Sequence, residues 1–266
     1  MHPASVRGVL LAAAALISAI TTPACAEEGV IRVGVTAGPH AEVLEVVRKT
    51  AAERGFTIKV VEFTDYVVPN QALAAKDIEA NSFQHEPYLK NQIAKTGWKI
   101  TKVADAIASP MGFYSKTYKS FADLPVGATL AIQNDPTNAA RSLQLLHANG
   151  IIKLKDPASV TAGVIDIADN PKAYRFIELD AAQLPRLLPD VDAASVNNNY
   201  AVQAGLDPVK DSIVKETADS PWVNIIAVRE EDRDQPLVAK LVEAYHSEPV
   251  KTFLGERFKG AYLPAW

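Results

Sequence analysis

The segment 82–89, Ser-Phe-Gln-His-Glu-Pro-Tyr-Leu, brings two aromatic rings and a histidine close together in the chain. It falls at a turn between an expected strand and an expected helix, because Pro87 suits the first turn of a helix, where its missing N–H costs nothing. The rings of Phe83 and Tyr88 could form a wall for an apolar or polarizable group. Core packing explains the same composition, so this segment alone leaves both interpretations open.

A second segment has the chemistry of an anion site. Asp135 and Pro136 are a favourable N-cap and a favourable first residue of a helix. The free N–H groups and the dipole at a helix N-terminus favour negative charge. The side chain of Arg141 would lean back toward an anion near Asn138, and its guanidinium could hold a carboxylate through two parallel hydrogen bonds. The alternative is a capped helix with Arg141 exposed to solvent.

Asparagines at further strand ends could recognise an amino acid. Asn197, Asn198 and Asn199 follow an expected strand, and amides offer both donors and acceptors to a carboxylate and an ammonium group. Turn formation is the alternative for these three. Asn224 lies inside the apolar run 222–228, where an unpaired polar group would cost roughly 1–3 kcal/mol. Its partner is therefore expected to be either the backbone or a bound ligand.

The residue patterns that catalysis or a metal would need are mostly missing. None of the histidines has a second histidine at metal-ligand spacing, and the HExxH, GxSxG, GxGxxG and P-loop patterns do not occur. Asp65 and Glu86 lie near the expected pocket, but a lone carboxylate is more often a capping or solvated group than a general base. We therefore expect no catalytic residue, no metal and no cofactor. The histidines are His2, His40, His85, His147 and His246.

Residues 1–26 have the layout of a secretory signal peptide. Arg7 precedes an apolar run at 9–20, and small residues surround Cys25. The run, about twelve residues, is too short to span a bilayer as a helix. Cleavage before Glu27 would release a soluble exported protein. Lipidation of Cys25 is the alternative, although Thr22 stands where a lipoprotein signal normally carries Leu or a similar apolar residue.

Composition narrows the possible partners. Cys25 is the only cysteine, so the chain after cleavage would have no disulfide, thiol nucleophile or cysteine metal site. The net charge of −4 would become one unit more negative with the loss of Arg7, and no basic patch stands out, so nucleic acid is not an expected partner. The remaining length suits one large or two medium domains. No later apolar segment is long enough to span a membrane.

Strand and helix patterns alternate along the rest of the chain, which is typical of an α/β protein with mostly parallel sheets. Two strand–turn–Pro–helix units, near residues 36 and 134, suggest two similar lobes. The expected strands are 31–35, 56–63, 78–81, 100–106, 111–114, 129–132, 193–196 and 223–228, with extended segments at 163–167 and 173–179. The expected helices are one that ends near 54, then 66–76, 87–95, 136–149, 180–187, 200–204, 235–245 and 249–258.

Eight short segments, taken in order, carry a resemblance to one family. Each is weak alone, but together they extend over roughly residues 31–266, and by them the chain resembles the NlpA family. In its MetQ type, members of this family are the methionine-binding components of bacterial ABC importers. The segments are 35–40, 63–66, 81–89, 110–115, 134–138, 178–186, 197–201 and 221–226.

The resemblance implies a two-lobed periplasmic-binding-protein fold of type II, with lobe I at 30–111 plus 224–266 and lobe II at 112–223. It implies that a monomer holds an amino acid, usually L-methionine, between the lobes and hands it to a membrane permease. The carboxylate-binding arginine of the family falls on Arg141. Its aromatic residues around the thioether fall on Phe63, Tyr66, Phe83 and Tyr88, with His85 beside them, and its asparagines fall on Asn138, Asn197 and Asn224.

Two residues in the pocket region depart from the pattern of the family. Ser82 stands where Ala is frequent, and Trp222 replaces a more usual Tyr near the crossover, which could alter the hinge or the pocket floor. Two other functions remain open. The fold can host enzymes such as periplasmic dehydratases of small acids, with His85 or Glu86 as general acid, and a surface protein without a ligand is the third interpretation. The sequence does not distinguish L-methionine from its D-isomer, a derivative or a short peptide as the ligand.

Overall fold

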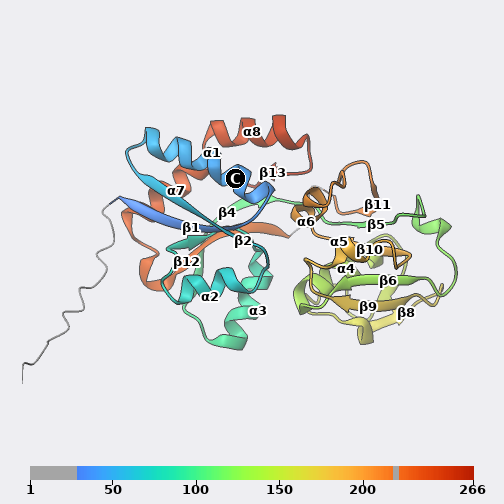
Figure 1. The fold of residues 1–266 in the computed structure, drawn as a ribbon. Coiled ribbons are helices and arrows are strands. Elements are labelled where there is room, and N and C mark those ends of the chain that lie inside the picture. Colours follow the sequence, from blue (N-terminus) through green and yellow to red (C-terminus); the bar gives the residue numbers. More distant parts are fainter. Residues whose placement is uncertain (1–28, 218–221) are drawn as a thin grey trace, which may run out of the picture.

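A computed structural model describes residues 29–217 and 222–266. The predicted signal peptide, with Arg7 and Cys25, lies outside the described residues. Two bodies lie side by side, each built on its own sheet (Figure 1). Lobe I surrounds a six-stranded sheet of order β13-β4-β12-β3-β1-β2, and lobe II surrounds a five-stranded sheet of order β11-β5-β10-β6-β9. The expected two-lobed α/β fold is therefore confirmed.

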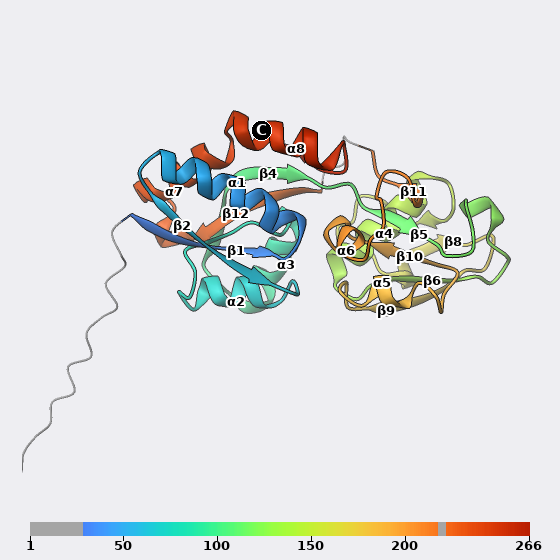
Figure 2. The ribbon, with the colours of Figure 1, turned by 45° about the horizontal axis from the view of Figure 1, so that its top comes forward.

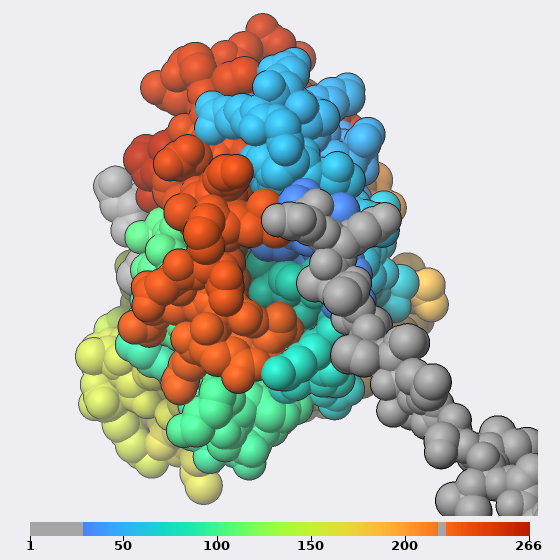
Figure 3. Space-filling view, turned by 90° about the vertical axis from the view of Figure 1, so that its left-hand side faces the viewer, coloured from blue at the N-terminus to red at the C-terminus, as the bar shows by residue number. Residues whose placement is uncertain are grey.

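Lobe I combines the first part of the chain with its last part. Its strands are β1 (Val30–Thr36), β2 (Thr57–Phe63), β3 (Ala80–Asn81), β4 (Ile100–Ala108), β12 (Val223–Arg229) and β13 (Leu263–Pro264). Its helices are α1 (Pro39–Glu53), α2 (Val68–Ala74), α3 (Glu86–Thr96), α7 (Pro236–Tyr245) and α8 (Glu248–Phe258), with a 3₁₀ turn η3 (Glu230–Asp232). Helix α1 packs on both α7 and α8, and Figure 3 shows this blue helix beside the orange and red C-terminal segments.

Lobe II is built from the middle of the chain. Its main strands are β5 (Gly112–Tyr114), β6 (Thr129–Gln133), β9 (Arg175–Leu179), β10 (Ala193–Val196) and β11 (Ser212–Lys215), and β7 (Lys153–Leu154) pairs with β8 (Ile167–Asp169) in a separate small sheet. Its helices are α4 (Pro136–Ala148), α5 (Leu184–Leu187) and α6 (Asn198–Gln203), with 3₁₀ turns η1 (Phe121–Asp123) and η2 (Val164–Asp166). Figure 2 shows that β4 points from lobe I toward lobe II, whereas β12 runs in the opposite direction, back into lobe I.

Local sequence explains why the helices begin beside the lobe interface. Pro39 occupies the first turn of α1 just after β1, and Val43, Leu44 and Val47 bury the inner face of the helix against the sheet. Asp135 caps α4 by accepting a hydrogen bond from the backbone N–H of Asn138, as expected for an Asp N-cap. Both helix starts follow the carboxyl ends of parallel strands, where ligands of α/β proteins usually bind.

The sheets are mixed rather than mostly parallel, which corrects the expectation. β1 pairs in parallel with β2 and β3, and β6 pairs in parallel with β9 and β10. The remaining pairs in these two sheets are antiparallel. The cause is the double crossing between the lobes: β4 leads out of lobe I and β12 leads back beside it, so these neighbours must run in opposite directions, and β5 and β11 repeat this in lobe II.

Other differences are local. The extended segment expected at 163–167 is a 3₁₀ turn followed by β8, and the helix expected at 180–187 shortens to the single turn α5. Strands β7, β11 and β13 were not predicted; β7 and β13 have only two residues each, too few for a periodic pattern. The lobe boundaries after 111 and 223 stay predictions; they fall between β4 and β5 and at the start of β12. Within the described residues, no helix is long and apolar enough to cross a membrane.

Candidate functional site

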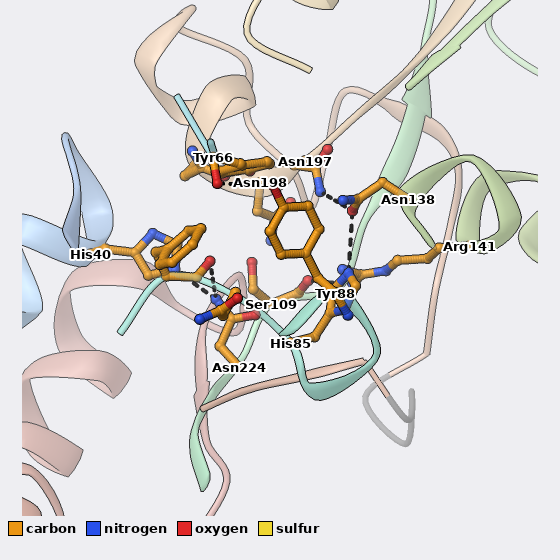
Figure 4. Close-up of a pocket in the computed structure, with 13 residues that line it drawn as sticks. His40, Tyr66, His85, Tyr88, Ser109, Asn138, Arg141, Asn197, Asn198 and Asn224 are labelled. Atoms are coloured by element: carbon orange, nitrogen blue, oxygen red, sulfur yellow. Dashed lines mark hydrogen bonds between the residues drawn. The ribbon is translucent and has the colours of Figure 1, made fainter. Parts of the chain in front are cut away.

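A cavity lies where the two lobes meet, and side chains of both lobes line it (Figure 4). All of the lining residues are buried except Tyr66, which is partly exposed. A ligand could therefore enter only if the walls separate. The lining residues are His40, Tyr66, Phe83, Gln84, His85, Tyr88, Ser109, Asn138, Arg141, Asn197, Asn198, Asn199 and Asn224.

The structure brings nearly all of the predicted site residues to this wall. Phe63 is the exception: its ring joins an apolar cluster in lobe I, with Ile78 and Leu73. It lies over Gly34, where a Cβ atom would stand only 2.9 Å from Phe63 Cε2. The ring therefore fills the space left by a missing side chain of β1. The predicted residues on the wall are Tyr66, Phe83, His85, Tyr88, Asn138, Arg141, Asn197 and Asn224.

One side of the cavity is aromatic. The ring centroids of Tyr66, Phe83 and Tyr88 are 6.0–6.3 Å apart, and Tyr200 packs on Tyr66 from lobe II at 5.1 Å. The Tyr88 hydroxyl donates to the backbone oxygen of Tyr66 at 2.9 Å. Burial raises the pKa of the Tyr66 hydroxyl well above its usual range, so this wall is uncharged at neutral pH.

His85 is held in one neutral form. The backbone N–H of Tyr88 donates to His85 Nδ1 at 3.1 Å, so the ring proton must lie on Nε2, which faces Asn138 Oδ1 at 3.4 Å. Burial, and then the charge of Arg141, lowers the pKa of His85 to about 3. Glu86 instead binds Lys90 and Lys102, which lower the pKa of its carboxyl. Neither residue is therefore placed to act as a general acid near neutral pH.

Arg141 is buried and already holds a carboxylate of the protein. Its Nε and Nη2 donate to the two oxygens of Glu216 at 2.7 and 2.6 Å, and Nη2 also donates to the Ser109 oxygen at 2.9 Å. The guanidinium edge that the sequence suggested for a ligand carboxylate is thus occupied by Glu216. Among the described residues, no partner is found for Arg141 Nη1. Trp222 packs beside both the guanidinium, at 5.7 Å, and the His85 ring, at 4.8 Å.

Asn224 finds its partners in the protein. Its Nδ2 lies 2.9 Å from His40 Nε2 and donates to the Phe83 oxygen at 3.2 Å. His40 Nδ1 lies 3.0 Å from Thr36 Oγ1, and burial lowers the pKa of His40 to about 4. A neutral His40 that accepts at Nε2 carries its proton at Nδ1 and donates to Thr36. Asn224 therefore turns its Nδ2 to His40 and Phe83, and no described residue donates to its Oδ1.

Two further asparagines on the wall have unsatisfied atoms. Asn199 accepts from the Tyr66 hydroxyl at 2.6 Å through Oδ1, and Asn198 donates to the Ala261 oxygen at 2.8 Å through Nδ2. Within the described part of the chain, Asn198 Oδ1 and Asn199 Nδ2 are buried without a hydrogen-bond partner. Buried polar atoms are normally satisfied, so these two atoms point to a polar occupant.

Sequence reasoning did not single out several residues of this site. His40, Gln84 and Ser109 line the cavity, and Glu216 pairs with Arg141. His40 had a usable signal, because it follows the turn at the carboxyl end of β1. Glu216 had none, since it lies 75 residues from Arg141 in the chain. Across residues 29–217 and 222–266, no group of His, Cys, Asp and Glu side chains is arranged to hold a metal ion.

The model of one protein family, described as NlpA lipoprotein, matches residues 31–266. The chain belongs to this family. A D-methionine-binding lipoprotein MetQ of Salmonella typhi is 43% identical over 262 residues, covering 96% of this chain and 97% of that protein. Outer membrane lipoprotein 2 of Mannheimia haemolytica, also similar to this chain, is 39% identical over 267 residues, covering 95% and 97%.

Solved structures agree with the assignment to the NlpA family. A nutrient-binding protein from Burkholderia cenocepacia bound to methionine is 52% identical, with a TM-score of 0.87, covering 89% of this chain and 100% of that one. The crystal structure of a methionine-binding protein, MetQ, is 43% identical, also with a TM-score of 0.87, covering 90% and 98%. The family resemblance found in the eight sequence segments is confirmed. The names of these NlpA-family relatives describe binding proteins and lipoproteins.

Proposed function

We propose that this NlpA-family protein is the extracytoplasmic substrate-binding protein of an ABC importer and carries methionine to a membrane permease. The observation that carries the proposal is the composition of the cavity: an aromatic wall and unpaired polar atoms of both kinds meet in one closed space. The relatives named for methionine binding, and the Burkholderia cenocepacia protein bound to methionine, support the same ligand.

The donors would hold the carboxylate of the ligand. Arg141 offers Nη1, and Asn199 Nδ2 is a buried donor without a partner among the described residues. Asn197 keeps one N–H of Nδ2, since the other donates to Asn138. Hydrogen bonds to a charged group each contribute about 1.5–3 kcal/mol, so this end of the cavity would dominate the affinity.

The acceptors would hold the ammonium group. Asn224 turns its Nδ2 to His40 and Phe83, and no described residue donates to its Oδ1; Asn198 Oδ1 is buried without a partner in the described chain. An ammonium group has three donors and no acceptor, so two carbonyl oxygens suit it. The rings of Tyr66, Phe83 and Tyr88 would then surround the thioether, where sulfur–ring contacts contribute about 0.3–1.5 kcal/mol each.

Charge balance favours a ligand without net charge. Glu216 neutralises Arg141, and burial keeps His40 and His85 neutral. A zwitterionic amino acid adds one charge of each sign, and each meets partners of the complementary kind. An anionic ligand would bring a charge into a buried site that is already balanced, which is costly.

The lobes at 30–111 plus 224–266 and at 112–223 would close on the ligand by hinge motion at the two crossings, near residues 110–112 and 223–224. Contacts already join them: Tyr66 binds Asn199, and the Tyr200 hydroxyl donates to the Thr64 oxygen at 3.2 Å. We also infer a monomer that is exported through the signal at 1–26. The family name and the relatives named lipoproteins favour an anchor at Cys25, and cleavage before Glu27 would instead give a soluble protein.

Mass spectrometry and titration calorimetry test the proposal. Small molecules released from the denatured protein, purified from cells grown with methionine, should include methionine. Titration of the ligand-free protein should give tight binding of L-methionine and about tenfold to hundredfold weaker binding of N-acetylmethionine, whose blocked amine leaves Asn224 Oδ1 unmatched. Failure of both methionine isomers to bind, or equal binding of the acetylated compound, would refute the assignment.

A further inference from the structure

A row of polar side chains in lobe II, all buried except the partly exposed Asp135, runs from the start of α4 through the cavity wall into the core. Asn138 Nδ2 donates to Asp135 Oδ2 at 2.9 Å, and Asn197 Nδ2 donates to Asn138 Oδ1 at 2.9 Å. Gln133 Nε2 donates to Asn197 Oδ1 at 2.8 Å, and Ser142 Oγ donates to Gln133 Oε1 at 2.6 Å. We name this row the amide relay; its members are Asp135, Asn138, Asn197, Gln133 and Ser142.

At the start of α4 the direction of the amide relay is set by Asp135. The two ends of an amide have nearly the same shape, so a row of amides could point either way. At the inner end the Ser142 hydroxyl both donates and accepts, while the backbone oxygen of Ser195, 3.4 Å from Gln133 Nε2, can only accept and favours the same direction. The Asp135 carboxylate only accepts, so the amide of Asn138 must turn its NH₂ toward Asp135 and its oxygen toward Asn197. Each following amide has to take the same direction.

The proton position on His85 in lobe I is compatible with the same direction of the amide relay. Its Nδ1 accepts from the backbone N–H of Tyr88, which can only donate, so its proton lies on Nε2 and faces Asn138 Oδ1 at 3.4 Å. In a reversed relay, Asn138 would turn its NH₂ toward this N–H, and two donors would face each other across the lobe interface. The correct direction is thus needed for contact between the closed lobes as well as within lobe II.

The direction of the amide relay also determines whether Asn197 presents an N–H donor or a carbonyl oxygen to the cavity. In the observed direction its Nδ2 keeps one N–H that no described residue takes, on the side of the cavity where Asn138 and Arg141 project from successive turns of α4. In the reversed direction a carbonyl oxygen would stand there and repel a carboxylate. We propose that Asp135 is a positioning residue of the binding site, which fixes the donor pattern of the cavity without lining it. The ligand carboxylate in this inference rests on the proposed function.

The variant Asp135→Asn tests the inference with almost no change of shape. The new amide keeps an oxygen for the N-cap bond to the backbone N–H of Asn138, but it replaces the acceptor Oδ2 by a donor. Two NH₂ groups then face each other at the start of the amide relay. We expect the affinity for L-methionine to fall by about 10- to 100-fold, because the relay must reverse or leave a buried donor unpaired.

The sign of this effect separates it from simple electrostatics. Removing a negative charge near the site should by itself favour an anionic group, so loss of affinity would be opposite to a charge effect. Asp180→Asn is the matched control. Asp180 also lies within electrostatic range of Tyr88 and also accepts a backbone N–H, that of Ala182, but it is not part of the amide relay. We expect this control to bind L-methionine like the wild type.

A second measurement needs no ligand and so stays meaningful if the proposed function fails. The side-chain amide protons of Asn197 and Gln133 should exchange slowly with solvent in the ligand-free wild type, and about tenfold or more faster in Asp135→Asn, as read by NMR. The double variant Asp135→Asn/Asn138→Asp restores one donor facing one acceptor and keeps the net charge, so it should restore the slow exchange, even if the single variant fails to fold.

Three results would overturn the inference. One is unchanged methionine affinity in Asp135→Asn. Another is equal loss of affinity in Asp135→Asn and Asp180→Asn, which would show that the loss does not depend on the amide relay. The third is unaltered amide exchange of Asn197 and Gln133 in the single variant, or exchange that the double variant fails to slow.

Discussion

Arg141 on α4 and Glu216 on the segment that returns to lobe I form a buried ion pair, with 2.6 Å between Nη2 and Oε2. The same pair holds the outgoing segment: Arg141 donates to the Ser109 oxygen, and Glu216 accepts the backbone N–H of Met111 at 2.9 Å. Both segments that cross between the lobes therefore meet at one guanidinium. A ligand that binds Arg141 would act directly on the hinge.

We expect Arg141→Ala to weaken methionine binding by about 10- to 100-fold, because at least one hydrogen bond to a charged group is lost. Tyr66→Phe should have a smaller effect, since it removes a hydroxyl that binds Asn199 and keeps the ring. Titration calorimetry of the two variants under the same conditions measures the difference. Equal affinities for Arg141→Ala and the wild type would remove Arg141 from the ligand-binding residues.

Glu216→Gln should lower the free energy of unfolding by about 3–5 kcal/mol, because it leaves a buried guanidinium without its counter-charge. The side chains of Arg141 and Glu216 are only 4% and 8% exposed, so solvent does not replace the lost partner. Urea denaturation measures the change. Glu231→Gln is the matched control: its ion pair with Lys76 is largely exposed, at 60% and 67%, and should matter little. Equal stability of the two variants would show that the buried pair is dispensable.

The sequence alone predicted the two-lobed fold and most of the cavity wall. This worked where local chemistry is strong: Asp135 and Pro136 define the start of α4, and the aromatic segment at 82–89 lies at the start of α3. Residues that follow strand ends were also placed correctly on the wall, because the carboxyl ends of parallel strands in both lobes face the interface.

The rest could not be read from the sequence because it depends on contacts between distant segments. Nothing close to Arg141 in the sequence indicates that Glu216 pairs with its guanidinium. Asn224 contacts His40, which is 184 residues away. Phe63 was assigned to the site, yet its ring turns toward the space over Gly34. The antiparallel pairs come from the double crossing between lobes, which a pattern of single strands does not reveal.

The protein should become less stable as the pH is lowered, because His40 titrates. Burial lowers its folded-state pKa from about 6.5 to about 4, so below pH 6.5 the unfolded chain binds a proton that the folded protein does not. Stability is therefore full above pH 6.5 and declines as the pH falls toward 4, by about 3 kcal/mol for this group. His40→Gln, whose amide oxygen can still accept from Asn224, should show a shallower decline in urea denaturation. An identical pH profile in both proteins would show that His40 is not the group that titrates.

A side chain at Gly34 should crowd two side chains of lobe I, because β1 passes directly beneath them. A Cβ atom there would lie 2.6 Å from Ile78 Cδ1 and 2.9 Å from Phe63 Cε2. We expect Gly34→Ala to lower the free energy of unfolding by about 1–3 kcal/mol, as overpacking does. Gly163→Ala is the control: its φ of −107° suits any residue and a Cβ would meet nothing within 4 Å. Phe63→Leu in the same chain should recover part of this loss. If the double variant were no more stable than Gly34→Ala, the crowding would not lie at Phe63.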